Sequence, residues 1–183
     1  HRENDMTMFK EYPKNPILII DDEESILLSI DTILQLAGLN HVITCSDSRD
    51  VIEIIERKPP SVVLLDLNMP HVNGEAILEK ITTLKPQTPI IIITGRIDAE
   101  TAVNCMKSGA FDYIVKPVDE NRLVASVKKS IQYCELQQEN LELKEQLRAG
   151  NLKQPEAFKK IITNSPKMLL LFSYIESIAQ TSQ

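Results

Sequence analysis

An alternation of two kinds of segment between residues 17 and 118 most constrains the fold of this chain. Five short segments are rich in β-branched residues, and three of them are apolar throughout, which is typical of strands buried on both faces of a parallel sheet. These segments are ILII (17–20), HVITC (41–45), VVLL (62–65), IIII (90–93) and YIV (113–115). The segments between them have helical spacing of apolar residues. We therefore expect an α/β fold with a doubly wound, five-stranded parallel sheet and helices on both faces.

Two of the helical segments show how the expected helices would pack. In the first, a buried stripe ends at Gly38, a residue suited to the left-handed position after a helix. The stripe consists of Ile26, Leu27, Ile30, Ile33, Leu34 and Ala37. In the fourth segment, Ala102, Val103 and Met106 precede Gly109 and predict a shorter buried face.

Polar side chains stand directly after four of the five expected strands. Asp21 and Asp22 follow the first, Asp66 the third, Thr94 the fourth and Lys116 the fifth. Ligands of doubly wound sheets bind just beyond the carboxyl ends of the strands. Any one of these residues alone would be explained as a solvated strand end, but five together indicate a functional site.

The chemistry that suits this set is phosphoryl transfer to a carboxylate. Three clustered carboxylates repel one another, and a divalent cation with a preference for hard oxygen ligands, such as Mg²⁺, removes that conflict. Asp66 is the best candidate for the nucleophile, and Asp21 and Asp22 are better placed as metal ligands. Lys116 would neutralise the new phosphoryl oxygens, and the Thr94 hydroxyl could donate a hydrogen bond to one of them.

The segments ILIIDDEES, VVLLDLNMPHVNG, IIIITG and GAFDYIVKP resemble the motifs of the receiver domain of two-component response regulators. The resemblance covers roughly residues 15–130 and implies the flavodoxin-like receiver fold. It implies that Asp66 accepts a phosphoryl group from a sensor histidine kinase. It also implies that Asp22, Asp66 and the Asn68 main-chain carbonyl bind Mg²⁺ directly, and that Asp21 binds it through water.

The same resemblance assigns switch residues and shows where the chain departs from its relatives. Thr94 matches the switch hydroxyl, Tyr113 the switch aromatic and Lys116 the phosphate-pairing lysine, whose bond to Pro117 is cis in the family. Arg96 and Ile97 stand where many relatives have an aromatic residue or histidine and then glycine. We expect that Ile97 stiffens this loop.

A second departure lies before Gly74. Asn73 stands there in place of the usual aspartate. Because asparagine tolerates a left-handed turn, we expect little effect.

After residue 118 the chain predicts one long helix, which Asp119 would cap and Gly150 would end. Past residue 131, residues recur at alternating steps of three and four, as in a coiled-coil seam that joins a homodimer. They are Tyr133, Leu136, Asn140, Leu143 and Leu147. The alternative is a single solvated helix with scattered leucines.

The segment from residue 158 to 183 resembles the opening of the AAA+ ATPase domain in NtrC-like, sigma-54-dependent transcription activators. No GxxxxGK[ST] motif occurs in the chain, so we expect no ATPase activity and no enzyme beyond the receiver's own phosphotransfer. The expected organisation is a receiver domain at 15–130, a helical linker at 131–150 and the start of a truncated AAA+ domain at 151–183. Phosphorylation would then control the oligomeric state of the attached ATPase and transcription.

The composition narrows the possible partners and the compartment. The net charge of −6 gives no indication of a basic surface that could bind nucleic acid. We therefore expect other domains to bind DNA and sigma-54 RNA polymerase. The three cysteines form no metal or disulfide pattern, and no apolar stretch approaches the ~18 residues of a membrane span. We therefore expect a cytoplasmic protein without a membrane segment.

Two other functions fit part of this pattern. A stand-alone phosphorelay receiver would need no ATPase domain, and the segment from Phe158 onward speaks against it. An Mg²⁺-dependent phosphatase with an aspartate nucleophile typically carries a second aspartate two residues later as general acid. Asn68 stands there and cannot serve as an acid.

Overall fold

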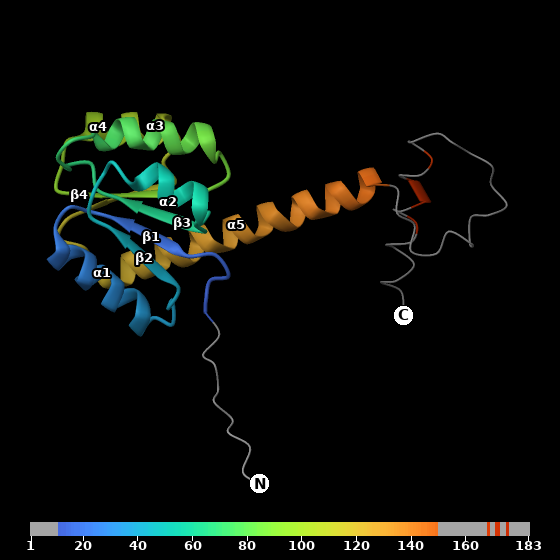
Figure 1. Ribbon diagram of the computed structural model, residues 1–183, viewed down its shortest axis with the longest axis horizontal. Coiled ribbons are helices and arrows are strands. Elements are labelled where there is room, and N and C mark those ends of the chain that lie inside the picture. The colour runs from blue at the N-terminus through green and yellow to red at the C-terminus, as the bar shows by residue number, and fades with distance from the viewer. Residues whose placement is uncertain (1–10, 150–167, 169–170, 173–174, 176–183) are drawn as a thin grey trace, which may run out of the picture. The chain divides into compact units, whose positions relative to one another are not determined.

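The computed structural model describes residues 11–149 and the single positions 168, 171, 172 and 175. Five parallel strands form one sheet in the order β2-β1-β3-β4-β5, and helices alternate with them along the chain (Figure 1). The strands are β1 (Ile17–Ile20), β2 (Val42–Cys45), β3 (Val62–Leu65), β4 (Ile90–Thr94) and β5 (Asp112–Val115). The helices are α1 (Glu24–Leu36), α2 (Val51–Arg57), α3 (Gly74–Leu84), α4 (Ala99–Lys107) and α5 (Glu120–Ala149). The predicted doubly wound fold is confirmed.

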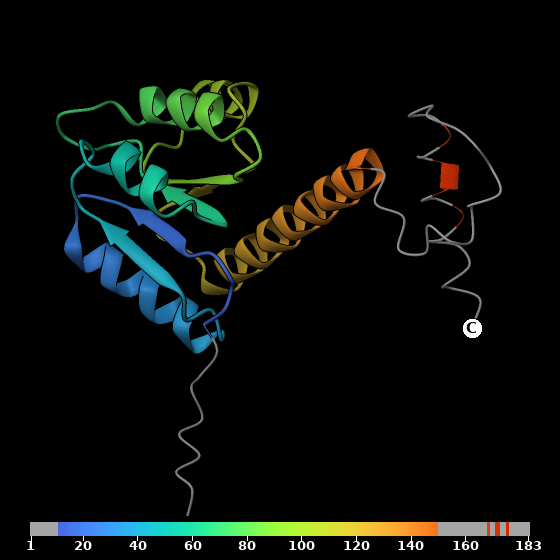
Figure 2. The same cartoon turned by 45° about the vertical axis from the view of Figure 1, so that its right-hand side comes forward.

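The sheet separates two hydrophobic cores. Because successive side chains of a strand point to opposite faces, Leu18 and Ile20 enter one core while Ile17 and Ile19 enter the other. The first core is closed by α2, α3 and α4, and the second by α1 and the first turns of α5 (Figure 2). The central strands β1, β3 and β4 are buried along their whole length, as their uninterrupted apolar runs predicted.

The buried face of α4 differs from the prediction. Val103 and Met106 are 50% and 47% exposed, whereas Cys105 is 2% exposed and packs in the first core. Cys105 lies one residue before Met106 and therefore about 100° round the helix. In a helix of nine residues, two neighbouring faces both carry apolar side chains, and spacing alone does not say which one meets the sheet.

Strand ends also differ slightly from the prediction. Thr94 is the last residue of β4 rather than the first residue after it, and β5 begins at Asp112. β2 begins at Val42.

Three residues considered for helix ends or turns can be compared with the structure. Gly38 follows α1 with a φ of +81°, and the Asp119 side chain accepts a hydrogen bond of 2.8 Å from the Arg122 backbone N–H, so both predictions are confirmed. Asn73 is not left-handed. It has a φ of −62° and caps α3 by accepting a hydrogen bond from the Glu75 backbone N–H, while His71 takes the positive φ of 73°.

Two polar contacts join the start of α5 to β5. The Ser126 hydroxyl donates a hydrogen bond of 2.6 Å to Asp112 Oδ2, and Arg122 donates one of 2.9 Å to the Tyr113 carbonyl. Further along, Leu123, Val127 and Ile131 are fully buried in the second core. The first turns of α5 are therefore fixed to the sheet by both apolar and polar contacts.

The chain divides into two compact units, His1–Cys134 and Glu135–Gln183, and the boundary falls within α5. Beyond it Leu136 is 65% exposed and Asn140 is exposed, while the side chains of Leu143 and Leu147 lie outside the described residues. The long helix is confirmed, and its pairing into a coiled coil stays a prediction. The segment predicted to begin an AAA+ domain (151–183) lies outside the described residues apart from four positions. Among the described helices, none is both long and apolar enough to cross a bilayer.

Candidate acidic phosphoacceptor site

The three aspartates lie together at the carboxyl edge of the sheet. Asp21 and Asp66 directly follow Ile20 and Leu65, which are register partners in the paired strands β1 and β3. The Asp66 backbone N–H donates a hydrogen bond of 2.9 Å to the Ile20 carbonyl and so extends that pairing by one residue. One carboxylate oxygen from each of Asp21, Asp22 and Asp66 lies within 4.8 Å of the others.

Lys116 reaches this cluster from the end of β5. Its Nζ lies 2.7 Å from Asp21 Oδ2 and 3.1 Å from Asp66 Oδ2, and the side chains of the two aspartates are only 3% and 4% exposed. Burial lowers the pKa of Lys116, but the hydrogen bonds to Asp21 and Asp66 and their charges outweigh it and hold the pKa above its ordinary value. The Lys116–Pro117 bond is cis, as the family resemblance implied.

Thr94, at the end of β4, and Tyr113, in β5, both bond to Arg96 in the loop after β4. Thr94 is fully buried, and its Oγ1 accepts a hydrogen bond of 3.4 Å from the Arg96 backbone N–H. The Tyr113 hydroxyl donates a hydrogen bond of 2.8 Å to the Arg96 carbonyl, and burial raises the pKa of Tyr113. The Lys116 backbone N–H donates to the Thr94 carbonyl at 2.9 Å, which ties the end of β4 to the lysine.

The start of α3 closes tightly on the loop that follows Asp66. A Cβ placed on Gly74 would stand 2.5 Å from the Leu67 Cα and 2.7 Å from the Asp66 carbonyl oxygen. Backbone atoms cannot move aside as the end of a flexible side chain can, so glycine is required here by the close approach. Gly74 therefore allows α3 to begin directly against the backbone of Asp66 and Leu67.

Sequence reasoning missed the side-chain contacts of Arg96. Its guanidinium donates a hydrogen bond of 3.0 Å from Nε to Asn68 Oδ1 and pairs through Nη1 with Glu75 Oε1 at 3.3 Å. The sequence signal was the departure of Arg96 from the family pattern, but the residues it contacts depend on the conformations of two loops. Arg96 therefore adds a positive side chain to the loops that follow β3 and β4.

The donor set fits a divalent cation. Three carboxylates lie together and one ammonium group pairs with two of them, so the cluster carries an excess of two negative charges. All its donors are hard oxygen atoms, which divalent cations such as Mg²⁺ prefer. The Asn68 backbone N–H donates to Asp66 Oδ1 at 3.2 Å, which places Asn68 directly beside the acidic residues.

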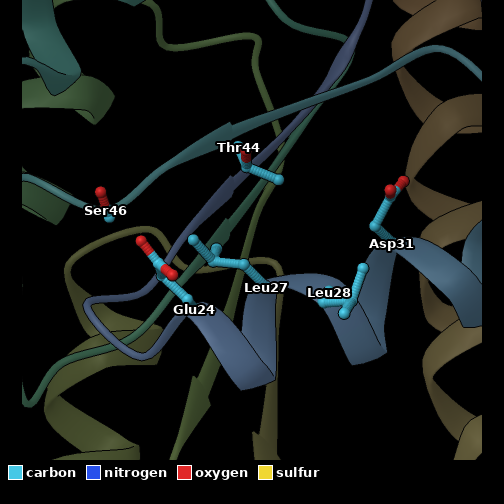
Figure 3. A pocket seen from close by; sticks show the side chains of 6 residues that line it. All are labelled: Glu24, Leu27, Leu28, Asp31, Thr44 and Ser46. Carbon is cyan, nitrogen blue, oxygen red and sulfur yellow. The ribbon is translucent and has the colours of Figure 1, made fainter.

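A separate open pocket of about 310 Å³ lies between α1 and β2 (Figure 3). Leu27 and Leu28 line it together with Glu24 and Asp31 of α1 and Thr44 and Ser46 of the β2 segment. None of the three clustered aspartates lines it. The residues suited to phosphoryl chemistry therefore belong to the edge of the sheet and not to this pocket.

These observations define a structural class. It is a doubly wound α/β domain in which an acidic cluster, paired with a lysine, lies at the carboxyl edge of the sheet. Residues 17–128 match the family model described as the response regulator receiver domain. The chain belongs to the response regulator receiver domain family. This is a family of regulator domains and not an enzyme family, which speaks against the phosphatase alternative.

Curated relatives of this chain are regulators of the NtrX and NtrC type. An NtrX-like response regulator of Rickettsia bellii is 41% identical over 130 residues, which are 70% of this chain and 27% of the relative. The DNA-binding transcriptional regulator NtrC of Escherichia coli is 33% identical over 166 residues, which are 91% of this chain and 33% of the relative. The chain thus spans about a third or less of the length of these relatives.

Solved structures agree with this relationship. A CheY-like receiver domain protein from Methanospirillum hungatei is 31% identical with a TM-score of 0.63, and the match covers 67% of this chain and 98% of that one. NtrX from Brucella abortus is 28% identical with a TM-score of 0.65, and the match covers 74% of this chain and 33% of that one.

Proposed function

We propose that this receiver domain accepts a phosphoryl group on Asp66 from a phosphohistidine of a sensor kinase. The observation that carries the proposal is the placement of the Asp66 carboxylate, which is nearly buried, bonded to Lys116 and beside Asp21 and Asp22. A buried carboxylate at the end of a strand, surrounded by cation-binding oxygens, is suited to attack a phosphorus atom.

Each residue of the site has a separate role in the reaction. An Asp66 carboxylate oxygen forms a bond to phosphorus as the P–N bond to the kinase imidazole breaks, and the imidazole nitrogen takes up a proton as it leaves. Lys116 exchanges its contact with Asp66 Oδ2 for one with a phosphoryl oxygen and keeps its bond to Asp21. The Thr94 hydroxyl then donates a hydrogen bond to the phosphoryl group, and Tyr113 follows the resulting shift of the loop after β4.

Asp22, Asp66 and the Asn68 main-chain carbonyl would hold Mg²⁺ directly, and Asp21 would hold it through water. The ion supplies charge neutralisation for the attacking carboxylate and for the phosphoryl oxygens. The excess negative charge of the cluster supports this assignment.

The experiment is incubation of the chain with Mg²⁺ and acetyl phosphate, followed by intact-mass analysis. We expect one acid-stable, base-labile phosphoryl group on the wild type and on Asp31→Asn, an aspartate of α1 outside the cluster, and none on Asp66→Asn. Equal labelling of Asp66→Asn would overturn the assignment.

We further propose that the phosphorylated state controls the oligomeric state of an attached sigma-54 activator ATPase, and with it transcription. The similarity to the Escherichia coli NtrC regulator supports this, since it extends over 166 residues and beyond the matched segment 17–128. In this proposal residues 15–130 are the receiver, 131–150 a linker that dimerises as a coiled coil, and 151–183 the start of the AAA+ domain. DNA and RNA polymerase are then contacted by other domains.

A further inference from the structure

Arg96 connects the loop after β4 to the loop after β3 through its side chain. Its Nε donates to Asn68 Oδ1 at 3.0 Å, and its Nη1 pairs with Glu75 Oε1 at 3.3 Å. Its backbone is fixed separately, because the Arg96 carbonyl accepts the hydrogen bond from the Tyr113 hydroxyl at 2.8 Å. One exposed arginine therefore has contacts in three different segments of the chain.

Asn68 is the residue through which these contacts reach the acidic cluster. Its backbone N–H donates to Asp66 Oδ1 at 3.2 Å, and its main-chain carbonyl belongs to the proposed metal ligands. Asn68 itself is exposed, although its neighbours Leu67 and Met69 are buried and half-buried. The bond from Arg96 to the Asn68 side chain thus restrains a residue whose backbone has to be correctly oriented.

We propose that Arg96 is a positioning residue, which holds Asn68 so that its backbone N–H and carbonyl face the acidic cluster. This role of Arg96 rests on the proposed function in one respect, which is that the Asn68 carbonyl binds the metal ion. Arg96 acts through Asn68, because the side-chain bonds of Arg96 go to Asn68 and Glu75. Groups that orient a metal ligand in this way typically contribute tenfold or more to metal affinity.

The chemistry of arginine suits this role better than that of lysine. The guanidinium is planar and presents several N–H donors in a fixed fork, so the Glu75 carboxylate on one side sets the direction of the donor to Asn68 on the other. An exposed ion pair such as Arg96–Glu75 contributes little to stability by itself. The contribution of Glu75 is therefore to orient the guanidinium.

A double-mutant cycle tests the proposal. Arg96→Ala, Asn68→Ala and the double variant are titrated with Mg²⁺, and the dissociation constant is obtained from the rise in melting temperature. The matched control is Arg57→Ala, which removes an equally charged, exposed arginine that is paired with Glu53 on α2. Asn68→Ala keeps the main-chain carbonyl and removes only the side chain that Arg96 holds.

We expect each single variant to bind Mg²⁺ roughly tenfold more weakly and the double variant to bind no more weakly than either single variant. Arg57→Ala should bind as the wild type does, and Arg96→Lys should recover only part of the loss. Unchanged affinity in Arg96→Ala, or losses that multiply in the double variant, would overturn the proposal.

A second measurement needs neither the cation nor a phosphodonor. In the presence of a chelator, the Asn68 backbone amide should exchange with solvent several-fold faster in Arg96→Ala than in the wild type, because its bond to Asp66 opens more often. Equal exchange rates would contradict the positioning role. A failure of phosphorylation at Asp66 would leave both measurements unaffected, so the two proposals can fail independently.

Discussion

Gly74, the first residue of α3, lies so close to Leu67 that a Cβ on Gly74 would stand 2.5 Å from the Leu67 Cα. We predict that Gly74→Ala lowers the free energy of unfolding by about 2–3 kcal/mol, because backbone has to move to admit the methyl group. Urea denaturation measures the loss. The matched control is Gly95→Ala, where a Cβ would meet nothing within 4 Å and the change should be small. Equal losses in the two variants would show that the contact does not matter.

Asp22 offers a test of the charge balance at the acidic cluster. In a chelator, Asp22→Asn should raise the melting temperature, because it removes one of three mutually repelling carboxylates. In Mg²⁺ the wild type should have the higher melting temperature. The bound cation stabilises the wild type by RT ln(1 + [L]/Kd), and the variant gains less because it binds the cation more weakly. Thermal melts with and without Mg²⁺ check both signs. A variant that is less stable in the chelator would contradict this account.

Ser126 tests how α5 is fixed to the sheet. The buried hydroxyl donates to the Asp112 carboxylate at 2.6 Å, and Ser126→Ala should lower the free energy of unfolding by about 1.5–3 kcal/mol. Ala125, the exposed neighbour on the same turn, supplies the control Ala125→Ser, which should be nearly neutral. Urea denaturation of the two variants distinguishes a specific hydrogen bond from a general effect of serine and alanine in a helix.

Asp98 provides a pH-dependent prediction. Its side chain caps α4 by accepting a hydrogen bond of 2.7 Å from the Thr101 backbone N–H. Hydrogen bonding to the Thr101 side chain, and then to this backbone N–H, lowers the pKa of Asp98 from its ordinary 3.8. The capping contribution should therefore be present above about pH 4 and disappear as the pH falls through the lower pKa of the folded state. The stability difference between wild type and Asp98→Ala, measured by denaturation across this range, should shrink on acidification. A constant difference would contradict the prediction.

The proposed coiled coil can be tested at Asn140 and Leu143. Leu136 is 65% exposed in the single chain, which leaves its apolar surface available to a second copy. Leu143→Asp should shift the population to monomer. Asn140→Leu should strengthen association but give a mixture of oligomeric states, because the pair of facing amides that selects the parallel register is lost. Light scattering at several concentrations measures both effects. An unchanged dimer in Leu143→Asp would place the interface elsewhere.

The sequence predicts the sheet and its acidic edge well because both follow from local patterns. Apolar runs set the strands, and Asp21, Asp66 and Lys116 come together because the carboxyl ends of parallel strands lie at one edge. The buried face of α4 and the contacts of Arg96 could not be predicted in the same way. They depend on how a short helix is rotated and on how two loops meet, and neither is encoded in the spacing of residues.

The attachment of α5 to β5 makes the fifth strand a link between the two sides of the sheet. The Tyr113 hydroxyl holds the loop that leads into α4, while the Tyr113 carbonyl accepts from Arg122 in the first turn of α5. One residue of β5 therefore bonds both to the loop beside the acidic cluster, through its side chain, and to the base of the helix that extends to Ala149, through its backbone.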